Sequence, residues 1–291
     1  MKKYIDLHTH TKNSDGAHTP EQLCAMALKA GIGALAITDH GYTEDVTNLR
    51  MEFPRLHLIQ GIELGTVYFD STGRDVCPHV VGLGFDPRHP KMQAVLKQNN
   101  PDRAPYINAI LDKLRLCGID LGTYEDLRKR FPDTRQIGRR DIAVCMKEEG
   151  YVSSVQEAYD IYIGAFGERR AFVPNPARYA TLEQTVDAIV SAGGIAVLAH
   201  LDYYHMSDDD NIRLVRIFKE LAGDRGAMEV YYASYTPERW AGLRAMADEV
   251  GLMYSAASDF HGQLDGDTLE HGFQIFDCRE LMEALGINCG V

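Results

Sequence analysis

Residues 4–10 read YIDLHTH, a short apolar run typical of a β-strand that ends in two histidines at alternate positions. Apolar runs that end in metal-binding residue types recur at residues 34–40, ALAITDH, and at residues 252–261, LMYSAASDFH. Alternate side chains that leave a strand can face the same side, so a His-x-His or Asp-x-His pair can chelate one ion. These stretches therefore predict strands that deliver metal-binding side chains to a common place.

Strand-like runs alternate with helical patterns along most of the 291 residues. This alternation favours a parallel sheet or barrel covered by helices, and chains of this length commonly form one barrel. In such folds the reactive groups gather at the carboxyl ends of the strands. We therefore predict an α/β barrel with strands near residues 4–7, 34–38, 58–64, 79–83, 195–199, 227–232 and 252–257.

The rhythm changes after residues 84–87, GFDP, where about 80 residues show helical periodicity and almost no β-branched runs. The predicted helices lie near residues 91–99, 105–117, 123–131, 139–148 and 154–164. We interpret residues 98–172 as a small helical domain, inserted into a barrel formed by residues 1–97 and 173–291. This insert carries twelve Lys/Arg and twelve Asp/Glu, so the net charge of −12 belongs to the barrel.

The overall charge and the cysteines narrow the function classes. A net charge of −12 argues against generic binding along a nucleic-acid backbone, so we expect no stable nucleic-acid complex. The six cysteines never approach a Cys-x-x-Cys spacing, which argues against a zinc ribbon and a thioredoxin-like motif. The N-terminus enters a strand without an apolar signal segment, and no run is long enough for a bilayer. We expect a cytoplasmic protein with reduced thiols and no membrane association, and the oligomeric state stays open.

Nine residues are candidate metal ligands because they lie at or near the ends of strand-like runs. His79 differs from the others because it precedes its strand. Glu63 is the sharpest case, since an acid in an apolar strand is costly to bury without a cation. Its two oxygens could also bridge two ions. Any one pair alone could be an ordinary polar strand end, but the full set favours a metal centre: His8, His10, Asp15, His40, Glu63, His79, His200, Asp259 and His261.

These residues resemble the signature of the PHP family, the polymerase and histidinol phosphatase domain. The matching stretches are residues 6–10 (DLHTH), 14–16 (SDG), 37–40 (ITDH), 61–63 (GIE), 199–200 (AH) and 258–261 (SDFH), together with His79. The resemblance implies a distorted (β/α)7 barrel that holds three metal ions. It is strongest to a branch with a helical insert, whose members hydrolyse nucleoside 3′,5′-bisphosphates such as pAp or trim RNA from its 5′ end.

The resemblance also implies how the ligands divide among three divalent ions. It places His8, His10, Glu63 and Asp259 at the first ion, Glu63, His79 and His200 at the second, and Asp15, His40 and His261 at the third. Mixed nitrogen and oxygen ligation suits manganese, zinc or iron and does not choose among them.

The substrate side of the resemblance is less regular. It implies phosphate contacts from Arg139, Arg140 and Asp141, but Asp141 replaces a histidine that is usual in the branch. Leu201 replaces a proline after His200, and Arg169 and Arg170 replace small residues and a proline. We predict a small nucleotide or a short oligoribonucleotide as the substrate. A second phosphate would bind the basic cluster of Arg128, Lys129, Arg130, Arg135, Arg139 and Arg140, although a solvated helix face explains such a cluster equally well.

We predict a metal-dependent phosphoesterase in which a hydroxide held between two ions attacks phosphorus in line, with no protein nucleophile. The third ion and Arg139 would neutralise the phosphoryl oxygens. One alternative is another metal-dependent hydrolase, such as a histidinol-phosphate-like phosphomonoesterase of amino-acid biosynthesis or an amide hydrolase. Another is a non-catalytic module that metal stabilises.

Overall fold

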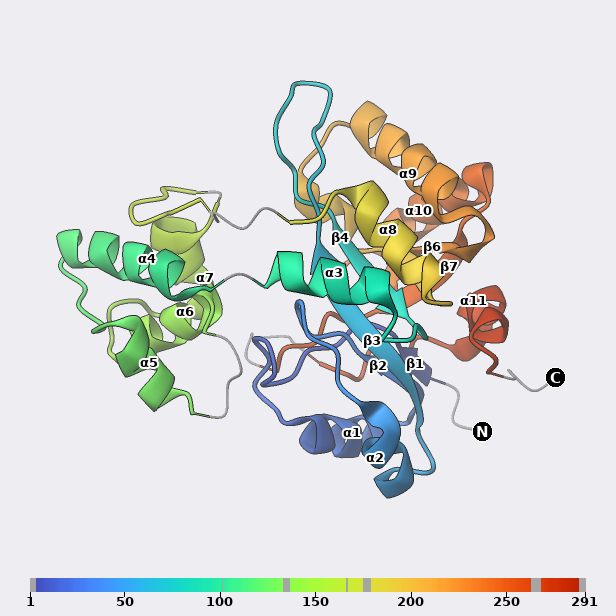
Figure 1. The fold of residues 1–291 in the computed structure, drawn as a ribbon, viewed down its shortest axis with the longest axis horizontal. Coiled ribbons are helices and arrows are strands. Elements are labelled where there is room, and N and C mark those ends of the chain that lie inside the picture. The colour runs from blue at the N-terminus through green and yellow to red at the C-terminus, as the bar shows by residue number, and fades with distance from the viewer. Residues whose placement is uncertain are drawn as a thin grey trace.

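Seven strands, neighbours in chain order, form the centre of the molecule (Figure 1). The structure is a computed structural model, and it describes residues 4–100, 102–132, 137–165, 167–174, 179–262 and 268–287. The strands are β1 (Tyr4–Asp6), β2 (Ile32–Ile37), β3 (His57–Gly65), β4 (His79–Leu83), β5 (Ile195–Leu198), β6 (Gly226–Tyr232) and β7 (Met253–Ala257).

The first and last strands approach each other and nearly close the sheet into a barrel. The backbone N–H of Leu7 donates to the carbonyl of Ala256 at 3.0 Å. Just beyond both strands, the N–H of Asp259 donates to the carbonyl of His8 at 2.9 Å. Small and branched apolar side chains such as Ala34, Val81 and Val197 fill the interior, so the barrel is a packed core.

Strand β4 corrects the expectation of a parallel sheet. It runs antiparallel to both β3 and β5, whereas the other neighbouring strands are parallel. His79, the first residue of β4, pairs with Gly65, the last residue of β3. The start of β4 therefore lies at the rim where the parallel strands end, which explains why this candidate ligand precedes its strand.

Helices cover the outside of the barrel. Strands β3 to β7 pack against an apolar layer that includes Met92, Val186, Leu214 and Leu243, one from each of four helices. The helix α2 was not predicted from the sequence. The barrel helices are α1 (Pro20–Lys29), α2 (Val46–Glu52), α3 (Pro90–Asn99), α8 (Leu182–Ser191), α9 (Asp208–Ala222), α10 (Pro237–Val250) and α11 (Arg279–Ala284), with short 3₁₀ turns η2 (Leu201–Tyr204), η3 (Gly223–Arg225) and η4 (Ile275–Cys278).

A second group of helices forms a lobe beside the barrel, coloured green in Figure 1. It has its own apolar cluster, in which Ile107 and Leu114 pack with Ile142 and Met146. The predicted helix at 154–164 is a short α-helix that continues as a π-helix. The lobe consists of α4 (Ala104–Leu116), α5 (Tyr124–Arg130), α6 (Arg139–Glu148), α7 (Val155–Ala158) and η1 (Tyr159–Ile163).

Two further expectations can be compared with the described residues. Cys24, Cys77, Cys117, Cys145 and Cys278 are not in disulfide bonds, and Cys289 lies outside the described part of the chain. None of the described helices combines the length and the apolar character that crossing a bilayer requires.

Candidate metal centre and arginine pocket

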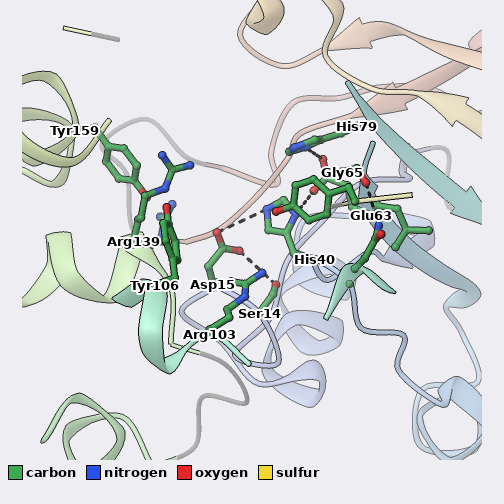
Figure 2. A pocket seen from close by; sticks show the side chains of 16 residues that line it. Ser14, Asp15, His40, Glu63, Gly65, His79, Arg103, Tyr106, Arg139 and Tyr159 are labelled. Carbon is green, nitrogen blue, oxygen red and sulfur yellow. Dashed lines mark hydrogen bonds and ion pairs between the residues drawn. The ribbon is translucent and has the colours of Figure 1, made fainter. Parts of the chain in front are cut away.

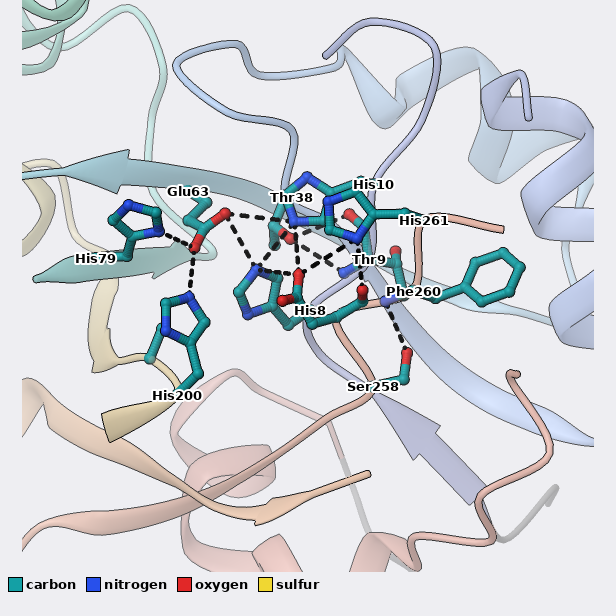
Figure 3. Close-up of polar contacts among 12 residues, drawn as sticks. His8, Thr9, His10, Thr38, Glu63, His79, His200, Ser258, Phe260 and His261 are labelled. Atoms are coloured by element: carbon teal, nitrogen blue, oxygen red, sulfur yellow. Dashed lines mark hydrogen bonds and ion pairs between the residues drawn. The ribbon is translucent and has the colours of Figure 1, made fainter. Parts of the chain in front are cut away.

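The nine candidate ligands predicted from the sequence meet at one rim of the barrel. Figure 3 shows part of this group: His8, His10, Glu63, His79, His200 and His261. They lie at the ends of β1, β2, β3, β5 and β7, at the start of β4, or in the loops that follow these strands. The six histidines of the set have ring nitrogens within 4 Å of a carboxylate oxygen of Glu63 or Asp15. Asp259 completes the set through its contacts with His8 and His10.

The most buried group comprises His8, His10, Glu63 and Asp259. The Nε2 atoms of the two histidines face each other at 3.1 Å. Glu63 Oε2 lies 3.3 Å from each of these nitrogens. Asp259 Oδ1 lies 3.4 Å from Nε2 of His8 and 3.0 Å from Nε2 of His10. The four ligand atoms thus surround one point.

Glu63 connects this group to a second one through its other oxygen. Its Oε1 lies 2.7 Å from Nδ1 of His79 and 3.0 Å from Nε2 of His200. Its Oε2 also lies 2.9 Å from Nδ1 of His40. The carboxylate therefore lies between two groups of imidazoles, with contacts to imidazole nitrogens at each of its oxygens.

Asp15 is the centre of a third, more open group. Its Oδ1 lies 3.3 Å from Nε2 of His261, and its Oδ2 lies 3.7 Å from Nε2 of His40. His261 uses its other ring nitrogen, Nδ1, to bond the backbone carbonyl of Asp259 at 2.7 Å. That bond holds Nε2 towards Asp15.

The four atoms of the first group fit a cation. A tetrahedral site with bonds of 2.0–2.1 Å to nitrogen and oxygen has edges of about 3.3 Å, and five of the edges here measure 3.0–3.4 Å. Glu63 Oε2 is buried and makes no hydrogen bond among the described residues, although imidazole nitrogens surround it. A buried carboxylate oxygen of this kind is expected to interact with a positive charge.

The pKa shifts of the clustered side chains also indicate that the cluster binds cations. Burial opposes protonation of His10, but the carboxylates of Asp259 and Glu63 outweigh it and raise its pKa to about 10. Burial also opposes ionisation of Glu63, yet the imidazoles of His40, His8 and His79 hold its pKa well below the usual range. The cluster therefore keeps its carboxylates ionised and attracts cations, whether protons or metal ions.

Three acids near the cluster were not predicted as site residues. Glu229, in β6, is buried and accepts hydrogen bonds from Nδ1 of His8 and from the backbone N–H of His200, both at 2.7 Å. It thereby fixes the His8 tautomer that directs Nε2 into the cluster. Asp6 accepts a bond from the Ser258 hydroxyl, and Asp39 accepts from the hydroxyls of Thr11 and Ser14.

Asp6 and Asp39 thus tie down the loops that carry the candidate ligands. Asp39 and His40 are neighbours in the sequence but have different contacts. Asp39 bonds the hydroxyls of Thr11 and Ser14, whereas the ring nitrogens of His40 lie close to Asp15 and Glu63.

We call the nine candidate ligands the metal cluster. A small cavity of about 160 Å³ opens between this cluster and the helical lobe (Figure 2). Asp15 and His40 face it from the barrel, and Arg139 and Tyr159 face it from the lobe. Arg103, which immediately precedes α4, lines the same cavity and was not predicted. Arg140 lines it as well. We call this cavity, with its three arginines Arg103, Arg139 and Arg140, the arginine pocket.

The other predicted substrate residues lie elsewhere. Asp141 does not line the pocket, because its Oδ2 accepts a bond of 2.7 Å from the Gly138 N–H at the start of α6. Arg130 pairs with Glu148 and Glu149 on the exposed side of α6, and Lys129 pairs with Asp126. Only part of the basic cluster therefore reaches the pocket, and Arg135 lies outside the described residues.

The residues that depart from the pattern of the resembling family lie away from the arginine pocket. Leu201 is buried in the layer between the barrel and its helices and begins η2. Arg169 lies over the ring of Phe172 and Arg170 pairs with Glu168, so neither lines the arginine pocket.

Comparison with known proteins agrees with this geometry. Residues 6–233 match the model of the PHP domain. The chain belongs to the PHP domain family. This PHP protein is 35% identical to the 5′-3′ exoribonuclease Rnm of Escherichia coli (strain K12), over 88% of its own length and 84% of the relative's.

A further relative and a solved structure cover nearly the whole PHP protein. It is 31% identical to the 3′,5′-nucleoside bisphosphate phosphatase of Chromobacterium violaceum, over 90% of its own length and 88% of the relative's. A structure described as an amidohydrolase from Chromobacterium violaceum, with bound sulfate and no metal, superposes with a TM-score of 0.77 at 30% identity. That superposition covers 96% of both chains. The fold and the clustered ligand types of this PHP protein are those of a family of metal-dependent enzymes.

Proposed function

We propose that this protein is a phosphoesterase that requires divalent metal ions and acts on a nucleotide-like substrate. The substrate is a nucleoside 3′,5′-bisphosphate such as pAp, or a short RNA attacked from its 5′ end. The observation that carries the proposal is the arginine pocket, which directly adjoins a cluster of histidines and carboxylates. The names of the two relatives, an exoribonuclease and a nucleoside bisphosphate phosphatase, support the same substrate class.

The proposed metal sites follow the three groups of side chains. His8, His10, Glu63 and Asp259 would hold the first ion, Glu63, His79 and His200 the second, and Asp15, His40 and His261 the third. Imidazole and carboxylate donors suit manganese, zinc or iron. When bound, such ions polarise a phosphoryl oxygen and lower the pKa of water towards neutrality.

The protein's own side chains position the candidate metal ligands and the phosphate-binding arginines. Glu229 orients His8, and the backbone bond of His261 orients its ring, so the groups are positioned before substrate arrives. Residues 98–172 act as a cap that brings Arg103, Arg139 and Arg140 against the open side of the cluster. No side chain is required as a nucleophile.

The arginine pocket anchors the phosphate that is not cleaved. Guanidinium groups bind phosphate through paired, charge-assisted hydrogen bonds. A pocket of about 160 Å³ that is lined by three arginines has the charge and the size for one phosphate group. A substrate with two phosphates would therefore place one at the metal cluster and one among the arginines.

Substitution of the pocket arginines tests the proposal. Arg139→Ala and Arg103→Ala should each raise KM for pAp about 10- to 150-fold, because a hydrogen bond to a charged group contributes about 1.5–3 kcal/mol. Neither should change KM for p-nitrophenyl phosphate, which lacks a second phosphate, by more than about twofold. Activities are compared at equal metal content.

Arg225→Ala is the matched control, because Arg225 lies in η3 and bonds the carbonyl of Gly193, away from the pocket. If the arginine variants raised KM equally for pAp and p-nitrophenyl phosphate, these arginines would not anchor a second phosphate. Absence of phosphate release from either substrate by the metal-loaded wild type would overturn the proposed function itself.

A further inference from the structure

A second and much larger cavity adjoins the metal cluster on another side. We call it the aromatic recess, and its volume is about 820 Å³. Asp259 and His261 belong to both the cluster and the recess, and Arg139, Arg140 and Tyr159 line both the recess and the arginine pocket. A molecule bound at the cluster could therefore extend into both cavities at once.

The recess differs from the arginine pocket in its chemistry. Aromatic rings make up much of its wall, from Tyr159 in the lobe to Tyr203, Tyr232, Trp240 and Phe273 in the barrel. The arginines are confined to the part shared with the pocket, and Asp160 and Asp259 add opposite charge. These surroundings favour a flat, uncharged group over a second phosphate.

Tyr203 lines this recess with an exposed aromatic side chain. Its side chain is 52% exposed, although it lies in the turn that directly follows His200. Its ring centroid lies 5.3 Å from that of His200 and 5.8 Å from that of Tyr232. Tyr232 is buried and donates its hydroxyl proton to Asp259 at 2.8 Å, so the wall behind Tyr203 is fixed.

The turn that carries Tyr203 is held from two directions. On one side, Arg239 of α10 pairs with Asp202, whose N–H donates to the hydroxyl of Tyr235 at 3.1 Å. On the other side, Arg74 in the β3–β4 connection donates to the carbonyls of Tyr204 and His205 at 3.1 and 3.0 Å. An exposed aromatic ring on a fixed turn is a preorganised stacking surface.

We propose that the aromatic recess binds the base of the nucleotide, which stacks on Tyr203, while the arginine pocket binds the distal phosphate. This inference rests on the proposed function and adds the orientation of the substrate. Stacking on an aromatic side chain accepts any base, so the recess selects nucleotides over other phosphate esters without selecting among bases. Its volume exceeds what one phosphate needs and lies within the range of pockets, roughly 300–1,000 Å³, that enclose whole small molecules.

The test compares pAp with 1-deoxyribose 3,5-bisphosphate, which carries both phosphates but no base. In the wild type, kcat/KM should favour pAp. Tyr203→Leu should reduce that preference about 5- to 150-fold, the range expected from the loss of one stacking contact. Tyr203→Trp, which retains a ring, should preserve it. Phe69→Leu is the matched control, because Phe69 is equally exposed at 53% but does not line the recess, and it should leave the preference unchanged.

Binding of adenosine provides a readout that does not depend on turnover. The metal-loaded wild type should bind adenosine, measured by saturation-transfer NMR, and Tyr203→Leu should weaken that binding while Phe69→Leu retains it. An unchanged preference in Tyr203→Leu, or equal loss on both bisphosphates, would overturn the base site. If the wild type hydrolyses neither bisphosphate, the proposed function fails, and adenosine binding still decides whether the recess accepts a base.

Discussion

The metal cluster and the arginine pocket lie side by side but are built in different ways. The candidate ligands come from one body, the rim of the barrel, and most of them lie within a strand or a few residues beyond its end. The arginine pocket combines residues of the rim with the beginnings of α4 and α6, which belong to the helical lobe. The candidate ligands are thus positioned by the backbone of one sheet, whereas the arginine pocket depends on how the lobe packs against the barrel.

Burial separates the two regions as well. His8 and His10 are fully buried and Glu63 is 1% exposed, so the cluster is closed on its inner side. Arg139 is only partly buried, and its guanidinium lies over the ring of Tyr159 at 5.9 Å. Buried, coupled charges tolerate little change, while a partly exposed cation can adjust. Substitutions in the cluster should therefore have larger effects than substitutions in the pocket.

The largest effect is expected for Glu63→Gln, because Glu63 contacts five imidazoles and has the position of a bridge. The variant should lose metal, as measured by elemental analysis, and kcat/KM should fall by about a thousandfold or more. Glu52→Gln, at an exposed site in α2, serves as the control and should retain both. Full metal content in Glu63→Gln would show that the cluster does not depend on the bridge.

The sequence predicted the cluster because each ligand has a local signal. His8 and His10 follow a strand, and Glu63 is an acid within an apolar strand, so both features can be recognised without the fold. Glu229 could have been found by the argument applied to Glu63, since it interrupts residues 226–232, GAMEVYY, in the same way. The reversed direction of β4 was not readable, because a strand carries no local mark of its orientation.

The arginine pocket could be predicted only in part, for a physical reason. Clustering in the sequence grouped Arg130 with Arg139, but the two residues lie on different helices and surfaces. Arg130 ends α5 and pairs with Glu148, whereas Arg139 begins α6 and lines the arginine pocket. Arg103 is far from both in the sequence and has no local signal. Packing of the lobe against the barrel alone makes it a neighbour of the site.

The second prediction concerns Asp141, a buried carboxylate whose pKa shifts in the direction opposite to that of Glu63. Burial raises the pKa of Asp141 to about 6, from 3.8. The folded state therefore holds a proton that the unfolded state releases, and the free energy of unfolding should fall as pH rises from about 4 to 6. The side chain in Asp141→Asn can still accept the Gly138 N–H but does not titrate. The free energy of unfolding of this variant, relative to wild type, should therefore rise by about 2–3 kcal/mol between pH 4 and pH 7.

Urea unfolding at several pH values measures this difference. Asp70→Asn is the control of opposite sign, because bonds from Thr72 and Arg74 lower the pKa of Asp70. The stability that Asp70 contributes is present above its unfolded pKa and is lost as pH falls. A pH-independent difference between Asp141→Asn and wild type would show that the carboxyl titrates normally.

The third prediction tests how far the cluster depends on groups behind it. Glu229→Gln retains the size of the side chain but weakens its bond to Nδ1 of His8, and it should lower metal affinity and kcat/KM about 10- to 100-fold. Asp210→Asn is a matched control, since Asp210 is also buried but its carboxylate accepts bonds from the hydroxyls of Ser71 and Ser207, away from the cluster. If metal affinity is unchanged in Glu229→Gln, orientation of His8 does not require this carboxylate.

The smallest effect is expected for Arg130→Ala. Arg130 pairs with Glu148 and Glu149 at a surface where its side chain is 34% exposed. Partly exposed ion pairs contribute about 0.2–1 kcal/mol, so the free energy of unfolding should fall by no more than about 1 kcal/mol. KM for pAp should not change, in contrast to the Arg139→Ala variant. If Arg130→Ala raises KM for pAp as much as Arg139→Ala does, Arg130 also takes part in phosphate binding, and the assignment of that role to the arginine pocket alone is wrong.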